Sequence, residues 1–349
     1  MKNIALCFDH ARGLRGVGGT TNATVLADLM RPDDGQIVWS PSGIGRTRLS
    51  RLHRRHIQAN AARTAVTEAY GFLVAEWSPG DRLFLLGAGL GAACARALAR
   101  LLGTVGVIDA DVPGWTAAEF REYVLANYVL PRTGRDDTDW ERFGRLAVAL
   151  SGGDDVAVDV NFLGLWDTVA VPGSGCAAPV LGNVLAARHA VAIDGGSRDA
   201  QLTGNAGEAV QEVWFRGAHC DVAGDHHACQ ALSGIALDWV LDGAVRAGAR
   251  VRQSPQRHAP NAVDALAGSA HTVSLRTLPA DAVVHASVES YLRAHPSYWR
   301  RLPARVEWAD PDWVARAERL VPGSPPNSAT APTVATENPA PAVPELLPG

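Results

Sequence analysis

The sequence predicts an α/β protein with a mostly parallel central sheet and helices on both faces. Three observations lead to this fold class. Short apolar runs alternate along the chain with longer stretches of helical periodicity, as they do in βα units. Most of these runs lack the polar alternation of a half-exposed strand, which is typical of strands buried on both faces. One run enters a helix through a glycine-rich turn, residues 87–91.

Apolar runs and helical periodicity place the individual elements. The expected strands are, in chain order, residues 4–8, 36–39, 82–86, 105–108, 156–165 and 213–215. The expected helices cover residues 22–30, 59–77, the stretch from the glycine turn to 102, and 232–247. Helical or irregular stretches separate the later strands.

Length and composition define the domain organisation. The chain has 349 residues, of which 47% are hydrophobic, so it can bury a large core. We expect one α/β domain over residues 1–320. Residues 321–349 are rich in Pro and Ala without apolar periodicity, which predicts a disordered tail.

The net charge and the absence of targeting signals limit the classes of binding partner and the cellular locations that we expect. The net charge of −4 supplies no broad positive field of the kind that binds nucleic acid or an anionic membrane. The sequence shows neither a cleavable signal peptide nor an apolar stretch long enough to span a bilayer. Its five cysteines form no CxxC pair, which favours reduced thiols. We therefore expect a cytoplasmic protein, with secretion by a route without a cleaved signal still open.

The turn after the third expected strand reads Gly87-Ala88-Gly89-Leu90-Gly91. In a hydrolase nucleophile elbow, G-x-S-x-G, the glycines permit a sharp turn and the serine stands exposed above the sheet. Here Gly89 takes the serine's position. The backbone pattern of the elbow is therefore present and its hydroxyl is absent.

The same turn also fits the dinucleotide pattern G-x-G-x-x-G/A through Gly87, Gly89 and Ala92. Asp109 follows about 20 residues later, near the end of the next expected strand, where a ribose-binding acid would lie. Taken locally, a cofactor site at Gly87, Gly89, Gly91 and Asp109 is the better match. However, a strand with its own glycine-rich loop precedes the turn, whereas a dinucleotide fingerprint normally opens its domain.

Two later motifs favour the hydrolase interpretation. Residues 162–169 form an apolar strand that ends at Asp167, and residues 214–222 place His219 just after another strand. Elbow, acid and histidine follow one another in the chain order of an α/β-hydrolase triad. We expect Asp167 to orient the imidazole of His219, which would act as a general base.

With these motifs the chain resembles the α/β-hydrolase family that contains the type VI secretion phospholipase effectors and many uncharacterised bacterial relatives. The resemblance runs in the family's order over roughly residues 3 to 245. The segments that carry it are residues 6–9, 21–22, 36–38, 43–45, 79–81, 162–169, 188–190, 213–224 and 232–239. It implies a lipase or esterase with a Ser-Asp-His triad, whose acid and base correspond to Asp167 and His219.

The departures from that family concern the nucleophile and its surroundings. Where the family's elbow usually reads Gly-Phe-Ser-Arg-Gly-Ala, this chain has Ala88, Gly89 and Leu90 in place of the aromatic, the serine and the arginine. After the first strand, His10-Ala11 replaces the family's Gly-Thr. The oxyanion or ligand loop, expected from Asp9, His10 and Leu90, is therefore altered as well.

Three functions remain open. Without a serine hydroxyl no acyl-enzyme can form at Gly89. The first hypothesis is a degenerate phospholipase-effector-like protein, a pseudoenzyme that binds an acyl-ester or lipid-like ligand and is inactive or weakly hydrolytic through a water activated by His219. The second is a protein that binds NAD(P) or another nucleotide at the glycine turn. The third is a non-catalytic interaction module whose tail recruits a protein partner, which the sequence does not identify.

A group of potential zinc ligands surrounds the candidate base, comprising His219, Asp221, Asp225, His226, His227 and Cys229. Their spacing matches no standard zinc site, so we expect a solvated loop with neither metal nor cofactor. Asp221 is expected only to fix this loop.

Overall fold

The computed structural model describes residues 1–9, 20–30, 32–41, 51–131, 135–152, 156–172, 181–195, 210–225, 227–252, 258–269 and 276–320. The described strands form one sheet of eight in the order β2-β1-β3-β4-β5-β6-β7-β8. Every neighbouring pair is parallel. The strands are β1 (Asn3–Phe8), β2 (Gln36–Trp39), β3 (Arg82–Ala88), β4 (Phe162–Trp166), β5 (Ala187–Ala192), β6 (Val210–Phe215), β7 (Val283–His285) and β8 (Glu307–Ala309). This confirms the predicted parallel α/β architecture.

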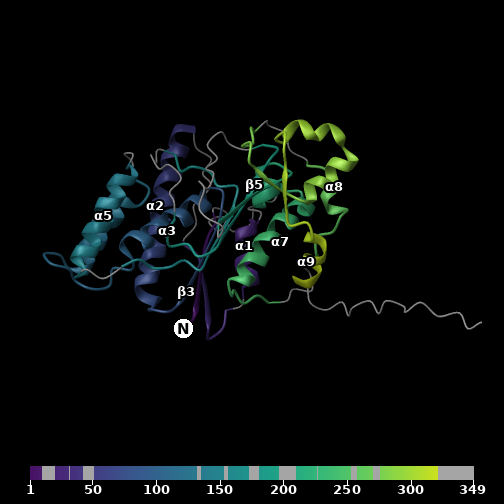
Figure 1. Ribbon diagram of the computed structural model, residues 1–349. Helices are drawn as coiled ribbons and strands as arrows, with labels where there is room; N and C mark the ends of the chain where they lie inside the picture. The colour runs from purple at the N-terminus through teal and green to yellow at the C-terminus, as the bar shows by residue number, and fades with distance from the viewer. Residues whose placement is uncertain are drawn as a thin grey trace, which may run out of the picture.

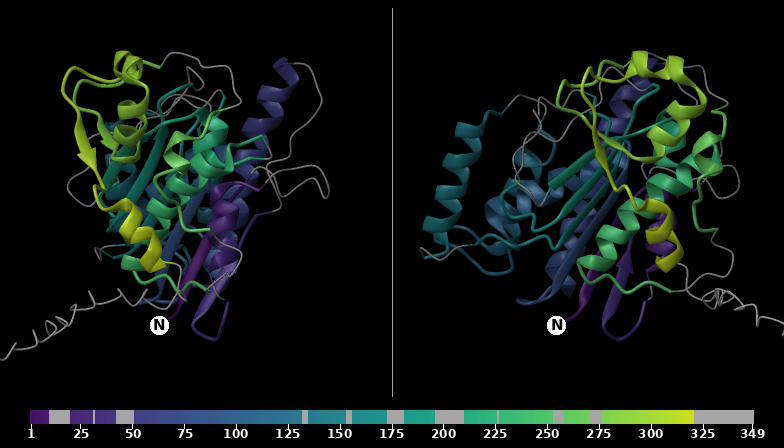
Figure 2. Two further views of the ribbon diagram at one scale, coloured as in Figure 1. Left: turned by 90° about the vertical axis from the view of Figure 1, so that its right-hand side faces the viewer. Right: turned by 45° about the vertical axis from the view of Figure 1, so that its right-hand side comes forward.

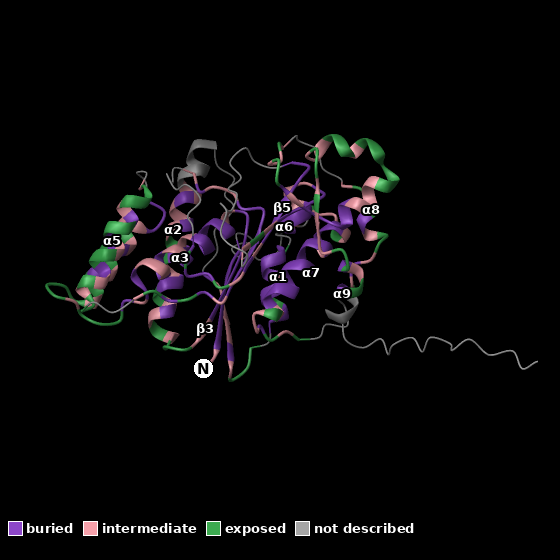
Figure 3. Ribbon diagram, in the orientation of Figure 1, coloured by how far each residue is buried: buried purple, intermediate pink, exposed green. Residues whose placement is uncertain are grey.

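Helices cover both faces of the sheet, as Figures 1 and 2 show. The helices are α1 (Asn22–Leu29), α2 (Arg51–Glu76), α3 (Leu90–Val105), α4 (Ala117–Tyr128), α5 (Asp137–Leu150), α6 (His219–Ala223), α7 (Gln230–Arg246), α8 (Ser287–Ala294) and α9 (Trp313–Leu320). Two short 3₁₀ helices, η1 (Asp264–Leu266) and η2 (Pro296–Arg301), lie in the C-terminal part. The central strands are buried on both sides, purple in Figure 3.

Alternation along β1 shows how the two layers form. Leu6 and Phe8 belong to the apolar cluster that includes α2 and α3, whereas Ala5 and Cys7 belong to the cluster that includes α1 and α7. Successive side chains of a strand point to opposite faces, so an unbroken apolar run supplies both cores.

The expected strand over residues 105–108 is wrong. Helix α3 continues to Val105, and no strand is assigned to residues 106–109. Gly106 ends the helix with a φ of 65°, and a Cβ there would lie 1.9 Å from the carbonyl oxygen of Val156. A short apolar run after a helix does not reveal by periodicity whether it continues the helix or begins a strand.

Three strands of the C-terminal half were not predicted. β5 carries Arg188 and His189, which interrupt its apolar pattern, while β7 and β8 have three residues each. A separate apolar cluster, which includes Val191, Trp214 and Val284, joins β7 to the rest of the sheet.

The predicted tail, residues 321–349, lies outside the described residues. Within the part of the chain that is described, no helix has both the length and the apolar character needed to cross a membrane.

Candidate active site

The glycine turn forms a sharp strand-to-helix elbow between β3 and α3. Gly89 has φ 56° and ψ −116° and is the N-cap of α3. A Cβ on Gly91 would lie 1.9 Å from the carbonyl oxygen of Phe8, and one on Gly87 would lie 2.6 Å from the backbone nitrogen of Ala92. Gly87 and Gly91 are therefore required by the close approach of β1 and the start of α3.

Position 89 faces the imidazole of His219. A Cβ built on Gly89 would lie 3.3 Å from both Nε2 and Cε1 of His219. This is a tight contact that a shift of a few tenths of an ångström relieves. A small side chain at position 89 would therefore contact the ring directly, and the positive φ of this position would add backbone strain.

Asp167 and His219 form a hydrogen-bonded pair, with 2.7 Å between Asp167 Oδ2 and His219 Nδ1. A carboxylate can only accept, so Nδ1 carries the proton and the Nε2 of a neutral ring has a free lone pair. That lone pair is on the side of Gly89. The carboxylate is 1% exposed and the imidazole 31%, so solvent or a ligand reaches the base but not the acid.

A network of donors fixes the carboxylate of Asp167. The backbone N–H of Ala192 donates to Oδ1 at 3.0 Å, and Arg276 donates to the same oxygen at 2.6 Å. Burial acts to raise the pKa of Asp167, but its hydrogen bonds and charge interactions with His219 and Arg276 outweigh it and lower the pKa to about 2. Asp167 also has a φ of 39°, a strained backbone conformation of the kind that concentrates at functional sites.

Arg276 is a site residue that the sequence analysis missed. It also donates to the carbonyl oxygen of Ala192 at 2.9 Å, and its guanidinium lies 5.9 Å from the ring centroid of Trp214. It comes from a part of the chain with no recognisable motif, 109 residues beyond Asp167. Nothing in the local pattern distinguishes it from an exposed arginine.

A second histidine, also missed as a site residue, fixes the residue after the acid. Nε2 of His189 accepts a hydrogen bond from the backbone N–H of Thr168 at 3.2 Å and lies 3.0 Å from its hydroxyl. Its Nδ1 therefore carries the proton and donates to Glu212 Oε2 at 3.0 Å. His189 is 1% exposed, so it positions the end of β4 and does not face solvent.

The loop before His219 is held by buried carboxylates. Gly217 donates its N–H to Asp194 Oδ2 at 2.8 Å. Asp221 accepts from the N–H groups of Ala218 and Cys229 and from the hydroxyl of Ser269, at 2.6 to 2.9 Å. Asp221 is fully buried, and these bonds agree with the expected loop-fixing role.

The potential zinc ligands do not form a cluster in the described part of the chain. No group of three or more His, Cys, Asp or Glu side chains there is arranged to hold a metal ion. His226 lies outside the described residues.

The predicted oxyanion loop is described only in part. Asp9 is buried at the end of β1 and accepts a hydrogen bond from the hydroxyl of Thr24 in α1. Leu90 is the first residue of α3, directly after Gly89, where a helix leaves its N–H groups without intrahelical partners. His10 lies outside the described residues.

The nucleotide hypothesis placed Asp109 at the end of a strand over residues 105–108, and the structure has no strand there. Asp109 is exposed and follows α3 through residues with no assigned strand. The turn itself follows β3, which lies beside β1 inside the sheet, and His219 rather than Asp109 faces Gly89.

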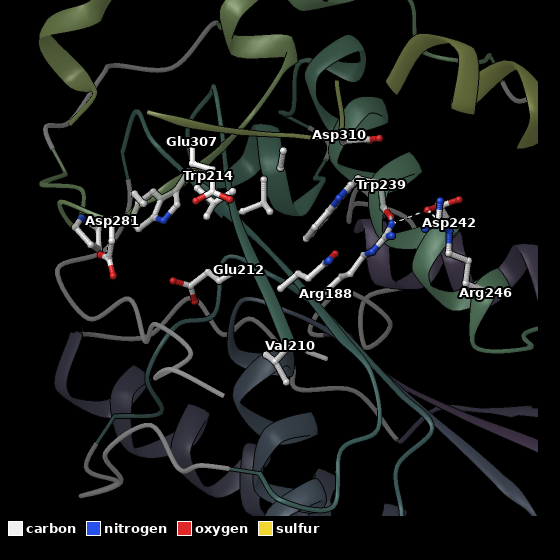
Figure 4. A pocket seen from close by; sticks show the side chains of 16 residues that line it. Arg188, Val210, Glu212, Trp214, Trp239, Asp242, Arg246, Asp281, Glu307 and Asp310 are labelled. Carbon is white, nitrogen blue, oxygen red and sulfur yellow. Dashed lines mark hydrogen bonds and ion pairs between the residues drawn. The ribbon is translucent and has the colours of Figure 1, made fainter. Parts of the chain in front are cut away.

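A cavity of about 790 Å³ lies away from the elbow, and neither Gly89, Asp167 nor His219 lines it. Figure 4 shows Glu212, Asp281 and Glu307 on one side of this cavity and the Arg188–Asp242 ion pair on the other. Its walls come mainly from β6, α7, the start of β7 with the residues before it, and β8. The cavity therefore belongs to the C-terminal part of the sheet and is separate from the dyad.

Two proteins similar to this chain are both uncharacterized. The chain is 30% identical over 190 residues to the uncharacterized protein YEL023C of Saccharomyces cerevisiae, a match that covers 48% of this chain and 26% of the yeast protein. An uncharacterized protein from Pseudomonas aeruginosa of known structure is 16% identical with a TM-score of 0.41, and the match covers 73% of this chain and 47% of that one. This chain thus spans less than half the length of either protein.

Residues 2–243 match the family model of the type VI secretion system (T6SS) phospholipase effector Tle1-like catalytic domain. The matched range includes the elbow, Asp167 and His219, and it ends before Arg276. Because it covers more than half of the sequence, the chain belongs to the T6SS phospholipase effector Tle1-like catalytic-domain family.

Proposed function

We propose that this protein is a degenerate lipase- or esterase-type hydrolase. It retains a site for an acyl-ester or lipid-like ligand but cannot form an acyl-enzyme, because glycine replaces the serine. Any hydrolysis is weak and uses a water molecule activated by His219. The observation that carries this proposal is the 3.3 Å between His219 Nε2 and the position of a Cβ on Gly89.

The chemistry available to such a site is general-base catalysis. Because the Nδ1–H of His219 is hydrogen-bonded to Asp167, Nε2 of His219 can accept a proton from a water molecule. The resulting hydroxide adds to the ester carbonyl, and the tetrahedral intermediate collapses with cleavage of the C–O bond. The leaving alkoxide takes the proton back from His219. Proton transfer by a positioned base contributes about 10² to 10⁴ in rate.

The position of Leu90 supports one of the two hydrogen-bond donors that an oxyanion would need. The N–H of the residue after the nucleophile is one of the two usual oxyanion donors in this fold, and Leu90 has that place at the start of α3. The positive end of the α3 dipole favours negative charge at the same point. An ester carbonyl bound there would be polarised even though no serine attacks it.

Restoring the hydroxyl is the decisive experiment. Gly89→Ser should make the protein react covalently with an alkyl fluorophosphonate. It should also hydrolyse a p-nitrophenyl ester at least about 100-fold faster than the wild type. Gly89→Ala adds a Cβ without a hydroxyl, so it should gain neither property. A folded Gly89→Ser protein that shows neither property would contradict the proposed site.

The residual activity of the wild type is tested separately. We expect slow hydrolysis of short- or long-chain esters, reduced by at least about tenfold in His219→Ala because the general base is lost. Equal rates for the two proteins would eliminate the activated water and leave ligand binding alone.

A further inference from the structure

The segment after β7 concentrates positive charge in a chain that is negative overall. Residues 291–306 contain four arginines and no acidic residue, whereas the whole chain has a net charge of −4. The segment comprises the end of α8, the 3₁₀ helix η2 and the turn that follows. The segment is therefore locally basic, although the net charge of the whole chain is negative.

Four side chains of this segment form what we call the docking surface, and they are Arg293, Trp299, Arg300 and Arg305. All four residues are exposed, and the exposed fraction of Trp299 is 63%. Arg293 has an exposed ion pair with Glu289 at 2.8 Å. The side chains of Arg300 and Arg305 make no ion pair or hydrogen bond with the described residues.

Trp299 is exposed, whereas Tyr298 and Leu302 of the same segment are half-buried. Tyr298 and Leu302 pack against the apolar cluster of Val191, Trp214 and Val284, so they occupy the inner side of η2. Trp299 is exposed to solvent and is followed in the sequence by Arg300 and Arg301. The exposed turns after α8 are green at the upper right of Figure 3.

The 3₁₀ helix η2, which carries Trp299 and Arg300 of the docking surface, contacts the loop that carries His219 through two other residues. The hydroxyl of Tyr298 donates to Asp194 Oδ2 at 2.8 Å, and Arg301 lies 3.4 Å from Asp194 Oδ1. The same Oδ2 accepts from the N–H of Gly217, two residues before His219. Asp194 follows the carboxyl end of β5, so these contacts bring η2 to the edge of the sheet where Asp167 and His219 follow β4 and β6.

From this arrangement we propose that the docking surface binds a bilayer that carries anionic lipid. Tryptophan partitions into the headgroup region of a membrane, and arginines are attracted by anionic lipid close to its surface. The chain has a net charge of −4, so attraction at this surface would contribute to orienting the protein on the bilayer. Duplex nucleic acid would attract the arginines but would give Trp299 no apolar environment.

This inference rests on the proposed lipid-ester ligand for its choice of partner, because the bilayer is where such a ligand would be met. The two proposals can fail separately, since vesicle binding is measured without hydrolysis. His219→Ala should bind vesicles as well as the wild type does.

The test is co-sedimentation with vesicles of ether-linked phosphatidylcholine, with and without ether-linked phosphatidylglycerol. The wild type should bind only the anionic vesicles, and about 1 M salt should release it because the Debye length falls to about 3 Å. Arg300→Gln/Arg305→Gln should bind about 30-fold more weakly, the product of two arginine contributions. Brominated lipid should quench the fluorescence of the wild type more than that of Trp299→Phe.

Matched variants on other elements serve as controls. Arg142→Gln/Arg145→Gln on α5 and Trp115→Ala should leave vesicle binding unchanged, because these exposed residues lie outside the docking surface. Thermal unfolding shows whether each variant is folded. Failure of the wild type to bind anionic vesicles, an equal loss in the controls, or tighter binding to duplex DNA than to anionic vesicles would overturn the inference.

Discussion

At position 89, glycine changes the stability of the elbow as well as its chemistry. A residue with a Cβ at φ 56° and ψ −116° is in a sparsely populated region, which costs about 1 to 3 kcal/mol. We expect Gly89→Ala to lower the free energy of unfolding by this amount in urea titrations. Gly182 has open space around it, so Gly182→Ala should have a much smaller effect. Equal effects would mean that the elbow imposes no strain.

The contribution of Arg276 to the stability of the fold depends on the charge of Asp167. Arg276→Met would leave a buried carboxylate with fewer partners, which we expect to cost about 3 kcal/mol at pH 7. The pKa of Asp167 is lowered to about 2, so its pairing stabilises the fold above its ordinary pKa near 4. That contribution is lost as the pH falls toward 2.

A double-mutant cycle measured by urea denaturation tests this coupling. In an Asp167→Asn background, Arg276→Met should cost much less, because no carboxylate remains to be stabilised. If the cost is the same in both backgrounds, Arg276 acts through packing rather than through charge.

At the scale of elements, Gly91 determines how closely α3 approaches β1. A Cβ there would lie 1.9 Å from the carbonyl oxygen of Phe8, so strand and helix would have to move apart. Gly91→Ala should therefore destabilise the protein by about 3 kcal/mol or more. Gly71 in α2 has nothing within 4 Å of an added Cβ, and Gly71→Ala should stabilise by about 0.5 to 1 kcal/mol. Thermal unfolding of both variants provides the comparison.

The junction of β7, β8 and α9 contains a buried histidine. His285 is fully buried, with Nδ1 2.8 Å from the hydroxyl of Ser287 and Nε2 3.3 Å from Asp310 Oδ2. Burial lowers the pKa of His285 below 6.5, against the opposing effect of Asp310. The unfolded chain therefore binds a proton below about pH 6.5 that folded His285 does not take up.

Stability should consequently fall as the pH drops below about 6.5, by up to about 1.4 kcal/mol per pH unit. His285→Gln cannot titrate and should show a flatter dependence between pH 7 and 5. Urea unfolding of both proteins across this range measures the difference. Parallel curves would show that His285 is protonated as easily in the fold as outside it.

At the scale of the whole molecule, the C-terminal part completes both the sheet and the site. β7 and β8 cover the β6 edge of the sheet, and Arg276 reaches Asp167 from the same part of the chain. A chain that ends at residue 269 would expose Trp214 and an unpaired strand edge. We expect it to aggregate or to lose cooperative thermal unfolding.

A chain that ends at residue 320 is the control for this truncation. Because residues 321–349 have a composition typical of disorder, their removal should leave the melting temperature unchanged. A large drop in the melting temperature would mean that the tail packs against the fold.

The sequence by itself determined the parallel sheet, the elbow and the chain order of Asp167 and His219. Apolar runs and glycine turns are local signals, and triad residues follow strands in a recognisable order. Periodicity did not separate the end of α3 from a strand at residues 105–108, and it did not reveal β5, because Arg188 and His189 interrupt its apolar pattern.

Only the tertiary structure decided which residues meet around the acid. Arg276 and His189 are ordinary polar residues in the sequence, and their roles arise from contacts across 109 and 21 residues of chain. In the tertiary structure the imidazole of His219 faces Gly89, and Asp109 does not. The physical reason is that hydrogen bonds and ion pairs in the site act between strand ends that only sheet formation brings together, whereas turns and apolar runs are encoded by neighbouring residues.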